Sequence, residues 1–392
     1  MTDPQPATRT RTHSGADSCR QDGTPKQPWI DWLKVVGMQL IVFGHTGGES
    51  MLPRLFSPIN AKQLGVAFFV FVTAFTLAQE KRRGRRVIFE RFFEMAYLGI
   101  VLSMVLSVIH WFTRGDLQES NYLPYLLGLN VYWENAFPAN PSTWYVGMYF
   151  HLLCLWAVLL RWIPLNWITL SIGLGTEILT RAGWLWLQRD YNGYMSVTNW
   201  ISVFLMGRLL GESDCLLSTS DLSSQAASRR RWPSASFPVA MVAATMLLGN
   251  HYIVQSMGIT HSNPFGRIPT SSQLVSSLVT SVHISCLYLA FTSIAVLLFA
   301  KATENRSIRF LAGNTLWVFL CHMPVRDWLT PHYYPWIRGW PRQLFNFLLF
   351  FVALAYVSQL VRWSLRVDWM KKWFAELGEE IRRWPAGRRS KS

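Results

Sequence analysis

Charged residues are scarce in this chain. Asp, Glu, Lys and Arg make up 15% of its 392 residues, against about 25% in soluble domains. The charges that are present form short basic clusters between long apolar runs. This pattern excludes a set of ordinary soluble domains and predicts a polytopic membrane protein. Membrane orientation also explains the net charge of +15, so we expect no nucleic-acid partner.

Common motifs for metal binding, nucleotide binding and serine nucleophiles are absent as well. The sequence contains no Walker A, G-x-S-x-G, G-x-G-x-x-G or H-E-x-x-H pattern. We therefore expect no metal site and no permanently bound cofactor. The cysteines show neither metal-ligand spacing nor a paired framework; they are Cys19, Cys154, Cys215, Cys286 and Cys321.

Long apolar runs, by contrast, are plentiful. Hydrophobic residues make up 51% of the chain, with 20 Trp. About ten runs reach the roughly 20 residues that a membrane-spanning helix needs. Glu177 and Arg181, four residues apart in the fifth run, are expected to pair with each other. The sequence predicts an all-α fold with about ten transmembrane helices, at residues 30–48, 62–79, 87–111, 142–161, 164–185, 195–211, 235–253, 273–300, 308–325 and 343–363.

The distribution of basic residues predicts how these spans are oriented. The two terminal tails and one alternating set of loops hold 25 Lys and Arg, and the opposite set of loops holds 8. The positive-inside rule then places both termini in the cytoplasm, which an even number of spans also requires. We predict that the protein lies in the cell (inner or plasma) membrane.

Two tails flank a predicted membrane domain at residues 29–365. Residues 1–28 are polar and lack the apolar core of a signal peptide, so they are predicted to be a disordered cytoplasmic tail. Residues 366–392 are basic, and apolar residues recur at helical spacing in "VDWMKKWFAELGEEIRRW". This spacing predicts an amphipathic helix that either lies on the cytoplasmic leaflet or packs on the bundle.

Three polar residues stand in the first span, "IDWLKVVGMQLIVFGH". Lys34 and His45 are eleven residues apart, close to a whole number of turns, so they share one helix face about 16 Å apart. Asp31 lies three residues before Lys34, near enough to pair with it. Such a stripe must face the bundle interior or a hydrated cavity. The residues alone leave two interpretations open: a functional stripe, or an Asp31–Lys34 anchor at the interface with His45 bonded to another helix.

The same three residues resemble the first-helix signature of the membrane acyltransferase-3 family, in which an Asp is followed by an Arg after three residues and by a His eleven further on. Lys34 takes the place of the Arg, and Thr73, Glu94 and Tyr149 also depart from the family pattern. Four further segments resemble family segments in the same order: "GVAFFVFVTAF" at 65–75, "RRVIFERFFEMAY" at 85–97, "STWYVGMYF" at 142–150 and "GNTLWVFLCHMP" at 313–324.

The resemblance implies an integral-membrane O-acyltransferase. Family members move an acyl group, commonly acetyl, from cytoplasmic acyl-CoA to a hydroxyl of a sugar, glycan or lipid-linked acceptor. His45 is then the expected general base, or the carrier of an acyl intermediate. Lys34 would orient the acyl group or stabilise charge along its path, and Asp31 would hold Lys34 in place.

The resemblance also suggests residues that bind the two substrates. Arg91 matches the family's basic position and is expected to hold the CoA phosphates together with Arg86; the basic run around Arg86 is otherwise an anchor against anionic lipid. His322 either meets His45 across the bundle or caps a helix before Pro324. Trp144 either stacks on a sugar or belongs to an interfacial aromatic belt.

Two other kinds of protein fit the sequence. A transporter or flippase for a glycolipid or small metabolite would use intramembrane His, Lys and Arg as a binding path. A membrane sensor would keep an acyltransferase fold without its activity. The absence of paired inverted repeats and the gathering of polar residues in the family-like segments favour the enzyme over the transporter.

Overall fold

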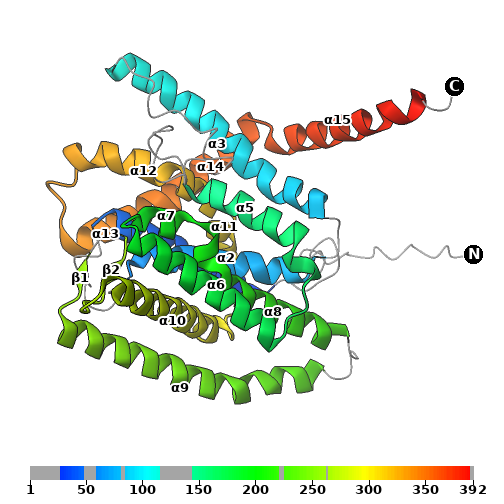
Figure 1. Ribbon diagram of the computed structural model, residues 1–392. Coiled ribbons are helices and arrows are strands. Elements are labelled where there is room, and N and C mark those ends of the chain that lie inside the picture. The colour runs from blue at the N-terminus through cyan, green and yellow to red at the C-terminus, as the bar shows by residue number, and fades with distance from the viewer. Residues whose placement is uncertain are drawn as a thin grey trace, which may run out of the picture.

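The part of the chain that the structure describes is almost entirely helical (Figure 1). Its only strands within the described ranges are β1 (Thr260–His261) and β2 (Gly266–Arg267), which pair antiparallel. This architecture confirms the predicted all-α class. Residues 1–26 of the predicted N-terminal tail lie outside the described residues. The computed structural model describes residues 27–47, 59–80, 84–114, 144–219, 225–261 and 264–388.

The helices follow the predicted apolar runs. The first half of the chain forms α1 (Pro28–His45), α2 (Ala61–Ala78), α3 (Gly84–Arg114), α5 (Trp144–Val158), η5 (Leu160–Trp162), α6 (Trp167–Trp186), α7 (Asp190–Met195) and η6 (Val197–Trp200). The second half forms α8 (Ile201–Thr219), α9 (Gln225–Met257), α10 (Gln273–Phe299), α11 (Arg306–Gly313), α12 (Thr315–His332), α13 (Gly339–Phe347), the π-helix η8 (Leu348–Ala353), α14 (Leu354–Ser364) and α15 (Val367–Arg388).

Every predicted span overlaps at least one of these helices. By length and composition, four stretches of the described chain are able to cross a membrane. They are Ala61–Ala78, Trp144–Trp162, Gln273–Phe299 and Gly339–Ser364. The membrane character is therefore clear, whereas the total of ten spans and the side on which the termini lie stay predictions.

The ninth predicted span, 308–325, differs from the observed helices. A break at Asn314 separates α11 from α12, and α12 then continues through Pro324 to His332. The Asn314 side chain causes this break by local bonding, since its Nδ2 donates to the Phe310 carbonyl over 2.7 Å. Its Oδ1 accepts from Gln359 on α14 over 2.9 Å. The amide thus ends one helix and fastens the next to α14.

Helix α2 lies at the centre of the bundle. Nearly all of its residues are buried, and it packs against α1 on one side and α8 on the other. Glycines allow both approaches. A Cβ added to Gly65 would lie 2.2 Å from the Gly37 carbonyl oxygen on α1, and one added to Gly207 on α8 would lie 2.5 Å from the Phe71 carbonyl oxygen. Small residues of this kind permit close backbone contact between membrane helices.

Replacing Gly65 with alanine is expected to separate α1 from α2. The new methyl group would meet backbone at 2.2 Å and the Ile41 side chain at 2.7 Å, and overpacking of this kind costs about 1–3 kcal/mol. Gly175→Ala on α6 is the matched control, because nothing lies within 4 Å of its added Cβ. Thermal unfolding in detergent, followed by tryptophan fluorescence, measures both. Equal stability of the two variants would contradict the close contact.

A buried ion pair joins the helices on the other side of α2. Arg181 Nη2 donates to Glu177 Oε1 over 2.6 Å, and both side chains are fully buried. Arg181 also donates to Asn199 Oδ1 over 2.5 Å and to the Ser281 carbonyl over 2.7 Å, while Glu177 Oε2 accepts from the Ser202 amide over 2.6 Å. This confirms the predicted pairing and shows that the pair connects α6, η6, α8 and α10.

The C-terminal helix α15 starts at a sharp turn and then projects from the helical body (Figure 1). At the turn, Arg366 adopts a φ of 47°, a left-handed conformation that side chains other than glycine seldom adopt. The first turns of α15 contact α3, where Lys371 Nζ donates to the Glu90 carbonyl over 2.9 Å and Phe374 packs on Phe93. The structure thus places a helix where the tail was predicted to form one, and packs its start on the bundle.

Candidate active site

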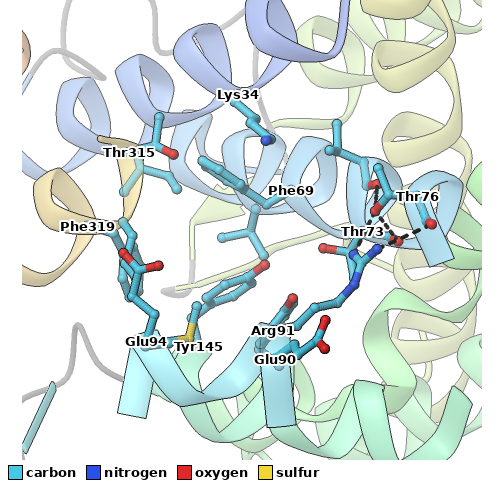
Figure 2. Close-up of a pocket in the computed structure, with 16 residues that line it drawn as sticks. Lys34, Phe69, Thr73, Thr76, Glu90, Arg91, Glu94, Tyr145, Thr315 and Phe319 are labelled. Atoms are coloured by element: carbon cyan, nitrogen blue, oxygen red, sulfur yellow. Dashed lines mark hydrogen bonds between the residues drawn. The ribbon is translucent and has the colours of Figure 1, made fainter. Parts of the chain in front are cut away.

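A cavity of about 330 Å³ opens between α1, α2, α3, α5 and α12 (Figure 2). We call it the Lys34 cavity. Its lining combines charged and hydroxyl-bearing residues with apolar ones. They are Lys34, Ile41, Val66, Phe69, Val72, Thr73, Thr76, Glu90, Arg91, Glu94, Met95, Tyr145, Tyr149, Thr315, Leu316 and Phe319.

Two predicted site residues with positive charge, Lys34 and Arg91, line this cavity. Lys34 points into it from α1, and Arg91 reaches from α3 toward α2 (Figure 2). Arg91 Nη1 donates to Thr76 Oγ1 over 2.8 Å, and Nη2 donates to the Thr76 carbonyl over 3.3 Å. These two bonds fix the guanidinium, while Glu90 and Glu94 add negative charge from α3. Such a mixture suits a ligand that is charged at one end and apolar at the other.

A pair of histidines lies behind the Phe319 wall of this cavity. The His322 ring is 5.8 Å from the Phe319 ring and 5.1 Å from the His45 ring, centroid to centroid. His322 is only 1% exposed, and its Nδ1 lies 2.6 Å from the Phe319 carbonyl oxygen. Because a carbonyl only accepts, Nδ1 carries the proton. In the neutral ring, Nε2 then holds a lone pair, and this buried atom has no hydrogen-bond partner among the described residues.

A second hollow, of about 440 Å³, opens directly beside His45. We call it the His45 pocket. It lies at the C-terminal end of α1, between α12 and α13, and shares no lining residue with the Lys34 cavity. The histidine pair therefore stands between two separate hollows. The pocket is lined by His45, Arg326, Asp327, Thr330, Pro331 and Arg342.

Three predicted site residues lie elsewhere. Asp31 does not line the Lys34 cavity. It lines a small separate cleft against α11, together with Arg309 and other residues. Arg86 is 69% exposed and pairs with Glu90 over 2.8 Å at the rim. Trp144 is buried in an aromatic cluster whose nearest ring is Tyr194 at 4.7 Å. The structure thus brings Lys34 together with Arg91 and His45 together with His322.

Several lining residues carried no predicted role. Thr73, Glu94 and Tyr149 stood out in the sequence as departures from the family pattern, and all three line the Lys34 cavity. In the sequence, Arg326 and Arg342 were only two of the eight Lys and Arg in the loops opposite the tails. Their position beside His45 follows from the packing of α12 and α13 on α1, which no local pattern reveals.

This helical fold, with apolar spans and polar side chains gathered around internal hollows, defines a polytopic membrane protein. A family model described as "Acyltransferase domain" matches residues 27–361. The chain therefore belongs to the membrane acyltransferase-3 family, and its general kind is a membrane acyltransferase. No curated protein and no solved structure matches the chain significantly.

Proposed function

We propose that the protein transfers an acyl group, most simply acetyl, from cytoplasmic acyl-CoA to a hydroxyl of a sugar, glycan or lipid-linked acceptor. The observation that supports this is the histidine pair between two hollows with no lining residue in common. In this proposal about ten helices span the cell membrane and both termini are cytoplasmic. The Lys34 cavity then receives the donor, and the His45 pocket receives the acceptor.

The chemistry of the Lys34 cavity fits an acyl thioester. Arg91 and Lys34 supply positive charge for the CoA phosphates or the thioester oxygen. Ile41, Phe69 and Phe319 supply an apolar wall for the acyl group. At position 34 this chain has the compact ammonium group of Lys instead of the planar guanidinium of Arg, which offers paired N–H donors. Lys34 is therefore assigned to electrostatic stabilisation, and not to bidentate binding.

We assign to His45 the proton transfer that the reaction needs. The neutral imidazole accepts the proton of the acceptor hydroxyl while the hydroxyl oxygen attacks the thioester carbon. The carbon–sulfur bond then breaks, and the CoA thiolate leaves and takes up a proton. Only Phe319 and His322 separate His45 from the Lys34 cavity along this line of ring contacts. The acyl group crosses this layer either directly or on a histidine.

Acyl transfer by the purified full-length chain tests the proposal. The protein in detergent or vesicles, given radiolabelled acetyl-CoA and a panel of glycans, is expected to label an acceptor. Arg91→Gln should raise the KM for acetyl-CoA by roughly tenfold, since it removes a charged contact to the donor. Arg306→Gln is the control, because Arg306 is exposed at the start of α11, does not line the Lys34 cavity and is expected to change KM far less.

Two results would contradict the proposal. One is the absence of label in every acceptor, including lipid extracts. The other is CoA-independent movement of a solute across sealed vesicles, which would favour the transporter.

A further inference from the structure

The His45 pocket carries an excess of positive charge. Arg326 forms an ion pair with its neighbour Asp327. The two charges balance, and Asp327 is the one acidic residue in the lining. Arg342 has no such partner, since no carboxylate of the described residues pairs with it. The buried Arg342 Nε has no hydrogen-bond partner among the described residues. Lys62, at the start of α2, adds a further positive charge near His45.

Neighbouring side chains hold Arg342 in a fixed position. Its guanidinium carbon lies 3.7 Å from the centre of the Tyr334 ring, a cation–π contact. The Tyr334 hydroxyl in turn donates to Asn346 Oδ1 over 2.7 Å. Burial raises the pKa of the Tyr334 phenol above its ordinary value, so the hydroxyl stays protonated and keeps this bond. Asn346 and Tyr334 thus orient a cation that lines the same pocket as His45.

An oriented guanidinium that pairs with no acid of the described residues, and that lies beside the proposed general base, is suited to bind an anion. Arg binds carboxylates and phosphates through paired N–H donors, and a pocket of this size falls in the usual range for small-molecule sites, roughly 300–1,000 Å³. We propose that the His45 pocket binds the acceptor through an anionic group, a carboxylate or a phosphate, held by Arg342. This inference rests on the proposed function, because it assigns the acceptor to this pocket.

The geometry supports a division of work within the pocket. Arg342 holds the anionic group, and His45 faces a hydroxyl of the same molecule. The Asp327 carboxylate is already paired with Arg326, so Arg342 is the lining cation left for the anion. A neutral acceptor would leave the charge of Arg342 without a partner, and such an uncompensated group lowers affinity. The pocket therefore selects acidic or phosphorylated acceptors over neutral ones.

Binding to the full-length chain in detergent provides the test. The probes are glucuronic acid, glucose 6-phosphate and glucose, with thermal stabilisation and calorimetry as readouts. Glucuronic acid or glucose 6-phosphate should bind wild type more tightly than glucose, by roughly tenfold or more. Arg342→Gln should abolish this preference. Arg338→Gln should keep it, because Arg338 is exposed near the start of α13 and does not line the pocket.

The outcomes separate the possibilities. The tighter of the two anions identifies the group as carboxylate or phosphate. Equal binding of glucose, or an unchanged preference in Arg342→Gln, overturns the inference. If Arg342→Gln does not fold, Arg342→Lys replaces it, and an unaltered anion affinity in that variant overturns the inference equally.

The failure of the proposed function looks different. Anion binding through Arg342 without acyl transfer to any acceptor would overturn the proposed function and leave the anion site standing. Acyl transfer to neutral glycans alone, with no anion preference, would overturn the inference and support the proposed function.

Discussion

Replacing His45 with alanine is expected to reduce acyl transfer by roughly 10²–10⁴-fold, the usual contribution of a positioned general base. The side chain is half-buried at the end of α1, with its ring 5.1 Å from that of His322, so its loss removes a base without disturbing the α1–α2 contact. The measurement is the rate of label transfer from acetyl-CoA to the acceptor. Gel filtration of the variant confirms that it is folded.

A matched control and a double variant sharpen this prediction. His332→Ala at the exposed end of α12 should leave the rate unchanged, because His332 lines neither hollow. If His45 and His322 act as one unit, the double variant should be hardly slower than the worse single variant. Full activity of His45→Ala would refute its assignment as the base. Strictly multiplicative losses would show that the two histidines act separately.

Removing one partner of the Glu177–Arg181 pair is expected to have the largest effect on stability. Both side chains are fully buried, and breaking a buried ion pair costs about 3–5 kcal/mol because the remaining charge stays uncompensated. Glu177→Ala would also leave the Ser202 amide without its carboxylate acceptor. Thermal unfolding in detergent should show a large drop in the midpoint, or no folded protein at all.

The exposed pair Lys372–Glu376 is the control for this effect. Its atoms are 3.8 Å apart and its side chains are mostly exposed, so Glu376→Ala should cost less than about 1 kcal/mol. The double variant Glu177→Leu with Arg181→Met removes both charges and should recover part of the loss. A Glu177→Ala protein as stable as Glu376→Ala would contradict the structural role of the buried pair.

Much of the fold was predictable because the membrane imposes strong local rules. Runs of about 20 apolar residues indicate helices wherever they occur, and the helical positions were predicted from them. The i, i+4 spacing of Glu177 and Arg181 likewise indicated their pairing. The break at Asn314 was not predicted, because an Asn inside an apolar run does not reveal whether its side chain will bond to the preceding helical turn. The continuation of α12 beyond Pro324 also went against the usual effect of proline inside a helix.

The site was predictable only in the parts that lie on one helix or match a family segment. Lys34 and His45 stood out as polar residues in an apolar span, and Arg91 as a basic residue inside another. The cavity itself joins residues from five helices, and no periodicity reveals which of their faces meet. The same limit hid Arg342, which reaches His45 only because α13 packs against the end of α1.

The bracing of α3 by the end of the chain has a consequence for biosynthesis. Tyr97 donates to the Leu365 carbonyl, Arg362 pairs with Glu94, and Lys371 donates to the Glu90 carbonyl. The first and last of these contacts join residues 268 and 281 positions apart. At roughly 5–20 residues per second, the ribosome needs on the order of 15–55 s to make that interval.

Through all of that interval the α3 wall of the Lys34 cavity lacks these contacts from the C-terminal part of the chain. The cavity is thus among the last parts of the molecule to be completed. A chain released before the start of α15 would carry nearly every helix of the bundle and still lack part of the support for its donor site.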